Sequence, residues 1–115
     1  MKHTIGKNLT AGVNNTLFSV PPGYKAAVEL LFISNLDANN KTVSAFWRHI
    51  NGATVDIDII DSYPMSAHEY IQFSNGVLIM QQGDSLIIIP EAGATQSALA
   101  TFDLYKEGQV PYVGV

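Results

Sequence analysis

The chain of 115 residues contains no cysteine. Disulfide bonds, thiolate metal sites and a cysteine nucleophile are therefore excluded, and the composition is typical of a protein kept in a reducing compartment. No apolar run approaches the roughly 18–20 residues of a membrane-spanning helix, since the longest, residues 26–34, is interrupted by Glu29. Polar residues follow Met1-Lys2-His3, so we expect no signal peptide and no membrane partner.

The chain is also poor in charge. Charged residues make up 14% of it, against about 25% in an average domain. The net charge is −4, and Lys2 and Lys7 are the nearest approach to a basic cluster, so we expect no nucleic-acid partner. A small domain has proportionally more surface to solvate, which leaves two interpretations. Either Asn, Gln, Ser and Thr cover the surface, or, as we favour, part of it is buried against other subunits.

Residues that could support catalysis or bind a metal are sparse. His3, His49 and His68 lack the two-residue spacing that puts ligands on one face of a strand, and His49, beside a turn, is expected to be solvated. Asp56 and Asp58 share a face but alternate with isoleucine, which is typical of a solubilising outer face. No phosphate-binding loop, dinucleotide motif or serine elbow occurs. We therefore expect no catalytic residue, metal or cofactor, and no enzyme activity.

Short apolar runs closed by turn residues follow one another along the chain. This rhythm is typical of an all-β antiparallel sandwich or barrel, here of about eight strands in a single domain over residues 1–115. No segment of about ten residues combines a helical period with a cap, so almost no helix is expected. The expected strands are residues 16–20, 26–34, 42–49, 53–61, 68–73, 77–80, 85–89 and 97–106.

Three of these segments carry further detail. Residues 26–33 are apolar on both parities, which predicts a strand covered on both faces. Asn51-Gly52 favours a tight hairpin turn, so residues 42–49 and 53–61 are expected to pair antiparallel. Residues 62–67, around Pro64, are expected to form a connecting loop.

Both ends of the chain are candidates for contacts with other subunits. Residues 1–13 are expected to form either an N-terminal arm or an edge strand. Residues 108–115 are apolar and broken by proline and glycine, so this C-terminal tail either folds back on its own domain or docks on a neighbouring chain. The candidate interface residues are Val110, Tyr112, Val113, Val115, Ile5 and Leu9.

Four segments in order carry a family resemblance: Thr-Leu-Phe-Ser-Val-Pro-Pro-Gly at 16–23, Leu-Phe-Ile-Ser-Asn at 31–35, Tyr-Ile-Gln-Phe at 70–73 and Gln-Gly-Asp-Ser-Leu at 82–86. Over roughly residues 14–105 the chain resembles small virion structural proteins of tailed bacteriophages. The Gly-Asp-Ser-Leu at 83–86 follows a turn and opens an isoleucine-rich strand, so it is not interpreted as the esterase motif of similar letters. The resemblance implies a β-sandwich, often jelly-roll-like, that assembles symmetrically on a virion and has no catalytic residues.

The function that the resemblance implies is a decoration or cement protein of the phage head. Such a chain would be made in the host cytoplasm and located on the virion. Its partners would be itself, with a homotrimer favoured and a ring possible, and the major capsid protein or another virion protein. A neck, tail or fibre-base component is an alternative. A carbohydrate-binding module, with Trp47, Tyr63 or Tyr70 as stacking platforms, is another.

Overall fold

A computed structural model describes residues 1–51, 53–74, 76 and 78–106. This part of the chain is built of strands joined by turns and contains no helix that could cross a membrane. The strands are β1 (Lys2–Asn8), β2 (Asn15–Ser19), β3 (Tyr24–Asn35), β4 (Lys41–Asn51), β5 (Ala53–Met65), β6 (Tyr70–Phe73), β7 (Leu78–Met80), β8 (Ser85–Pro90) and β9 (Gln96–Lys106).

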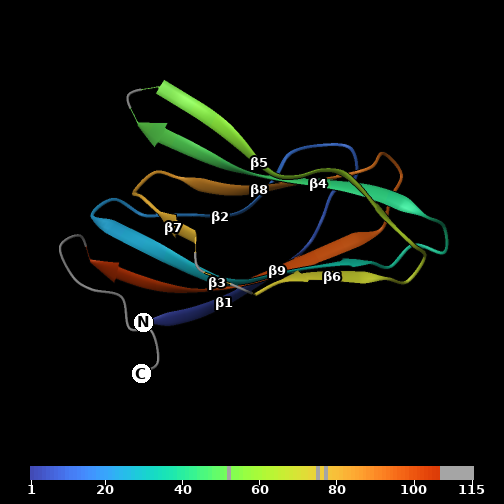
Figure 1. The fold of residues 1–115 in the computed structure, drawn as a ribbon, viewed down its shortest axis with the longest axis horizontal. Helices are drawn as coiled ribbons and strands as arrows, with labels where there is room; N and C mark the ends of the chain where they lie inside the picture. Colours follow the sequence, from blue (N-terminus) through green and yellow to red (C-terminus); the bar gives the residue numbers. More distant parts are fainter. Residues whose placement is uncertain (52, 75, 77, 107–115) are drawn as a thin grey trace.

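The strands form two facing antiparallel sheets (Figure 1). One has the order β1-β9-β3-β6, with β7 also pairing with β3, and the other has the order β2-β8-β4-β5. The pairs are nested: β4 with β5, β3 with β6 and β7, β2 with β8, and β1 with β9. A long hairpin rolled up in this way is a jelly roll. The predicted all-β, jelly-roll-like sandwich is therefore confirmed.

The two-sided apolar pattern of β3 has a local cause. Its register with β9 shifts between Val28 and Leu30, which leaves Glu29 as the extra residue of a bulge. A bulge moves the following side chains to the opposite parity. Ala26 and Val28 therefore face the core before it, and Leu31 and Ile33 face the core after it. The apolar residues on both parities thus arise partly from this switch, and only partly from cover on both faces.

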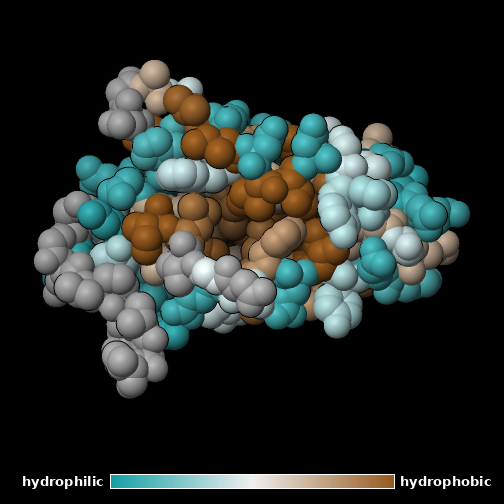
Figure 2. All heavy atoms as spheres, viewed as in Figure 1, coloured by the Kyte–Doolittle hydropathy of each residue, from teal (hydrophilic) through white to brown (hydrophobic). Residues whose placement is uncertain are grey.

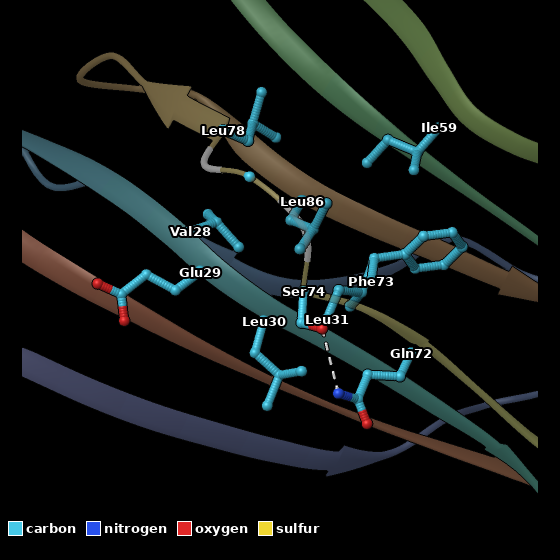
Figure 3. Close-up of a pocket in the computed structure, with 11 residues that line it drawn as sticks. Val28, Glu29, Leu30, Leu31, Ile59, Gln72, Phe73, Ser74, Leu78 and Leu86 are labelled. Atoms are coloured by element: carbon cyan, nitrogen blue, oxygen red, sulfur yellow. Dashed lines mark hydrogen bonds between the residues drawn. The ribbon is translucent and has the colours of Figure 1, made fainter. Parts of the chain in front are cut away.

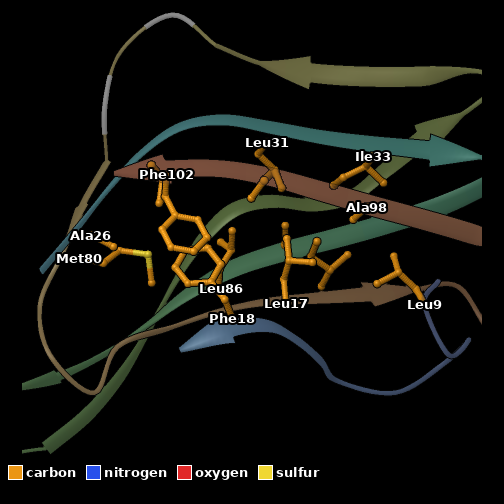
Figure 4. Packing of buried hydrophobic residues seen from close by; sticks show 14 of the residues in the cluster. Leu9, Leu17, Phe18, Ala26, Leu31, Ile33, Met80, Leu86, Ala98 and Phe102 are labelled. Carbon is orange, nitrogen blue, oxygen red and sulfur yellow. The ribbon is translucent and has the colours of Figure 1, made fainter. Parts of the chain in front are cut away.

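The core lies between the two sheets and draws side chains from nearly every strand (Figure 4). The rings of Phe18 in β2 and Phe102 in β9 stack with centroids 4.2 Å apart, joining one sheet to the other. His3 lies against the same Phe102 ring at 5.6 Å. Ile88 and Met80, both fully buried, belong to the same cluster.

Two expected boundaries are wrong. Residues 62–65 are not a loop, because β5 continues through Pro64 to Met65 and pairs with β4 to its end. Proline lacks an N–H, and a sheet tolerates it at the edge position that β5 occupies. His68 adopts a positive φ of 58° within a turn, so β6 begins only at Tyr70.

Most of the N-terminal segment pairs with the neighbouring strand β9. From Lys2 opposite Asp103 to Asn8 opposite Ser97, β1 is bonded to β9 as an edge strand. Of the two expectations for residues 1–13, the edge strand is the one observed. The tail at residues 108–115 lies outside the described residues.

Candidate functional site

An apolar groove opens along one side of the sandwich, where the β5 edge of one sheet faces the β6 and β7 edge of the other. Figure 2 shows it as a hollow of hydrophobic surface in the middle of the visible face. Its volume is about 520 Å³. The lining residues, most of which appear in Figure 3, are Val28, Glu29, Leu30, Leu31, Ile59, Gln72, Phe73, Ser74, Gly76, Leu78 and Leu86.

The floor of the groove is the core itself. Val28 and Leu31 of β3 and Leu86 of β8 are buried residues of the hydrophobic cluster that also line the opening. Val28 pairs with Leu78 of β7, and Leu31 pairs with Phe73 of β6. These two floor residues therefore flank the place where β7 gives way to β6 along the edge of β3. The groove opens at this break in the edge, opposite Leu86 of the other sheet.

The walls are apolar and partly exposed. Ile59 comes from β5, Phe73 from β6 and Leu78 from β7. Farther along β5, Ile57 and Val55 lie beside Trp47 and His49 and remain exposed. The groove thus continues into an apolar strip toward the tip of the β4–β5 hairpin. We call Val55, Ile57 and Ile59 the β5 strip.

Polar groups at the rim are already engaged in hydrogen bonds. Lys2 Nζ contacts both carboxylate oxygens of Glu29, at 2.8 and 2.9 Å. Gln72 Nε2 donates to Ser74 Oγ at 3.2 Å. The inside of the groove therefore offers apolar contact to a side chain or an alkyl group.

The other face of β5 carries charge. Arg48 Nε and Nη2 donate to the two carboxylate oxygens of Asp56 at 2.8 and 3.1 Å. This hydrogen bonding outweighs the effect of desolvation and, together with the positive charge of Arg48, holds the pKa of Asp56 below its usual value. Asp58 lies opposite Phe46 two residues farther along. The expectation of a polar outer face on this strand agrees with these positions.

A buried carboxylate lies away from the groove, in the turn between β7 and β8. Asp84 is fully buried and accepts hydrogen bonds from Trp47 Nε1 at 2.9 Å, Ile50 N at 3.0 Å and Gln81 N at 2.9 Å. Nδ1 of His49 lies 3.0 Å from its Oδ2. Burial raises the pKa of Asp84, but these hydrogen bonds outweigh it and keep the pKa below the usual value.

The arrangement around Asp84 is structural, and it corrects one expectation. His49 is not a solvated ring, because its side chain is mostly covered and lies against both Asp84 and the indole of Trp47, with ring centroids 4.8 Å apart. His3 lies in β1 and His68 in a turn, so the structure does not bring the three histidines together. Sequence reasoning missed Asp84. The available signal was its position after Gly83, in a turn that opens a strand.

The candidate interface residues have different outcomes. Ile5 lies on the edge strand β1 and is partly exposed. Leu9 is only 8% exposed and packs in the core, so the assignment of its side chain to an interface is wrong. Its position directly after β1, where Leu9 N donates to Gln96 O at 2.9 Å, turns it inward. Val110, Tyr112, Val113 and Val115 lie outside the described residues.

The three candidate stacking aromatics are not gathered into one surface. Trp47 packs against the core and donates to Asp84. Tyr63 is exposed on β5, in one sheet, and Tyr70 is 61% exposed on β6, in the other. Tyr70 stacks on Phe32 with centroids 4.9 Å apart. Tyr70 is therefore the best-presented aromatic platform of the three.

No protein-family model and no curated protein matches the chain. Among solved structures, a chain of infectious bursal disease virus, Gx strain, is similar with a TM-score of 0.52 and 14% identity, covering 96% of this chain and 32% of that one. The globular domain of zebrafish complement 1qA protein gives a TM-score of 0.46 and 16% identity over 92% of this chain and 98% of that one. The present chain thus spans about a third of the length of the viral chain. Its likeness to the viral chain shows that the two share a β-sandwich fold.

Proposed function

We propose that this chain is a non-enzymatic structural protein of a phage virion, which self-associates and docks on the capsid as a decoration or cement protein. The observation that carries the proposal is the apolar groove together with the exposed β5 strip. The β-sandwich shared with a chain of infectious bursal disease virus supports it, as does the resemblance to small virion proteins over residues 14–105.

An apolar surface of this kind has an energetic consequence. Each Å² of apolar surface removed from water contributes about 25 cal/mol, and contiguous exposed apolar patches commonly mark interaction sites. The β5 strip places three large aliphatic side chains beside a groove whose floor is the core. Burial of these side chains against another subunit would also explain why a small domain has only 14% charged residues to solvate its surface.

The position on the particle sets the expected symmetry. A decoration protein of the head fits a homotrimer, our first choice, whereas a neck, tail or fibre-base component fits a ring. Both arrangements use the same apolar side of the sandwich and differ in the number of copies. The number of copies is therefore the first quantity to measure.

The test is the solution mass of the full chain, by light scattering after size exclusion at several concentrations. We expect a closed oligomer that Ile57→Asp disrupts, because a charge in an apolar contact must be desolvated. Val13→Asp is the matched control, since Val13 is 49% and Ile57 44% exposed, and Val13 precedes β2 at the opposite sheet edge. A monomer at every concentration, or equal effects of both variants, would contradict self-association through this side.

Location on the virion needs its own experiment. An antiserum against the chain should decorate purified phage particles in immunogold electron microscopy, and the pattern on head, neck or tail decides between the alternatives. Absence of the chain from particles, checked by mass spectrometry of their proteins, would contradict a virion role.

A carbohydrate-binding module is a second candidate because Tyr70 offers an exposed ring backed by Phe32. Sugars stack on such rings through their C–H faces. If this function holds, the chain binds a glycan array and Tyr70→Ala removes the binding without lowering the melting temperature. Trp47→Ala is a poor test of the same idea, since losing its packing and its bond to Asp84 destabilises the fold.

A further inference from the structure

We propose that the groove receives the C-terminal segment, residues 108–115, of a second copy of the chain. The inference rests on the proposed self-association and names the contact that produces it. The groove is the receptor, and the segment of the neighbouring copy is the occupant.

The chemistry of the two surfaces matches. Residues 108–115 read Gly-Gln-Val-Pro-Tyr-Val-Gly-Val and carry no charged side chain. The groove presents Val28, Leu31 and Leu86 at its floor. At its rim lie the neutral Gln72 and Ser74 and the carboxylate of Glu29, which is bonded to Lys2. Its volume of about 520 Å³ lies within the range of about 300–1,000 Å³ typical of binding pockets. An uncharged, apolar peptide can therefore enter without desolvating a side-chain charge of its own.

The strands beside the groove favour an extended peptide. β5 and β6 are the edge strands of their sheets, so each has one side outside the ladder within its own sheet. An extended segment can add to such an edge through its backbone. Alternate side chains, Val110 and Tyr112, would then point the same way about 7 Å apart. Two apolar side chains could enter the groove together while the backbone lies along an edge.

Reach favours the segment of a second copy over that of the same chain. Lys106 pairs with Tyr24 on one side of β3, whereas Phe73, at the far end of the groove, pairs with Leu31 on the other side. The separation is about 23 Å along β3 and about 10 Å across two strand spacings, or about 25 Å in a straight line. Four residues extend at most about 14 Å, so Val110 of the same chain cannot contact Phe73, and only the later residues of the segment can reach that far. A second copy has no such constraint, and all four apolar side chains can contribute.

The absence of cysteine allows a direct test in the full chain. Ile59→Cys places a thiol in the groove wall, and Val113→Cys places one in the segment. Mixed under mild oxidation, these variants should form a covalent dimer of twice the chain mass at least tenfold faster than a mixture of Ile79→Cys with Val113→Cys. Ile79 is the matched control because it pairs with Ala27 in β7 but does not line the groove.

A second pair of variants keeps the test independent of cross-linking chemistry. Phe73→Asp should weaken self-association, while Ile79→Asp should not, although both side chains are 38% exposed. Thermal melting of both variants checks that each remains folded. An Ile59→Cys/Val113→Cys double variant should give intermolecular dimers, and should not close on itself after dilution.

Two results would overturn the inference. Equal cross-linking of Ile59→Cys and Ile79→Cys places the segment elsewhere, and a disulfide within one chain that survives dilution shows that the segment does not pass between copies. Both results leave the proposed function separately testable. If the chain is an oligomer on virions but this cross-link does not form, the proposed structural role stands and only the groove is rejected as the contact.

Discussion

The indole Nε1 of Trp47 donates to Oδ2 of Asp84 at 2.9 Å, joining the middle of β4 to the turn that opens β8. The same carboxylate accepts from the backbone of Ile50 and of Gln81. A fully buried carboxylate is tolerated because these donors replace water. The pairing of β4 with β8 and the path of the preceding turn therefore depend on one side chain.

Replacing this carboxylate should be costly. Asp84→Ala removes the acceptor and leaves the N–H groups of Trp47, Ile50 and Gln81 without it in the interior, at about 3 kcal/mol in the free energy of unfolding. Urea unfolding at pH 7 measures the change as a lower midpoint with an unchanged slope. Ser19→Ala, at an exposed hydroxyl bonded to Ser85, is the control and should change the free energy by about 0.5 kcal/mol. A loss for Asp84→Ala no larger than that of the control contradicts the account.

The same group predicts a response to acid. The pKa of Asp84 in the folded chain lies below its ordinary value, which is about 3.9 in an unfolded chain. Its stabilising contribution is therefore complete above about pH 4 and is lost as the pH falls through the lower, folded pKa. Asp84→Asn, which cannot titrate, should lose less stability between pH 6 and pH 3 than the unsubstituted chain. Equal losses, measured by thermal melting at each pH, would show that other carboxylates dominate the response.

The aromatic stack between the sheets should be a centre of stability. Phe102→Ala removes the ring that packs 4.2 Å from Phe18 and also contacts His3. We expect a loss of about 3–4 kcal/mol from the free energy of unfolding, because the ring leaves a cavity between the sheets. Phe73→Ala, at the exposed wall of the groove, should cost about 1 kcal/mol. Denaturant unfolding compares the two, and a similar cost at both positions would contradict the placement of Phe102 in the core.

Removal of residues 109–115 separates assembly from folding. The buried residues of the hydrophobic cluster, among the described part of the chain, run from Leu9 to Phe102, so we expect the truncated chain to retain its β-sheet circular dichroism and cooperative unfolding. Assembly should weaken, because Val110, Tyr112, Val113 and Val115 are lost. Light scattering measures the mass before and after truncation. An unchanged mass would contradict a contribution of these residues to assembly.

The sequence predicted most of the strands because their ends are set locally. Pro21-Pro22-Gly23 and Asn51-Gly52 interrupt any regular run, and alternating residues in β5 show their two faces without tertiary information. The bulge at Glu29 could not be predicted in the same way, since it exists only as a shift of register against β9. The inward course of Leu9 has the same origin, because its backbone is bonded to Gln96, far away in sequence.

The groove was also beyond sequence reasoning. Val28, Leu31 and Leu86 have the pattern of core residues, and they are core residues. They line an opening where the edge of β3 passes from pairing with β7 to pairing with β6, and this pairing cannot be derived from the local sequence. Asp84 illustrates the complementary case, since one acidic residue in a polar turn gives no sign that Trp47 and Ile50 of another strand will supply its hydrogen bonds.

The nested pairing of the strands also orders the folding reaction. The pairing of β4 with β5 begins between Asn51 and Ala53, two residues apart in the sequence, whereas β1 must pair with β9 at the far end of the chain. The entropy lost on closing a loop grows with its length, and folds dominated by distant contacts form slowly. We therefore expect the β4–β5 hairpin to form early and β1 to join last, so that the edge beside Phe102 stays open during most of the approach to the native state.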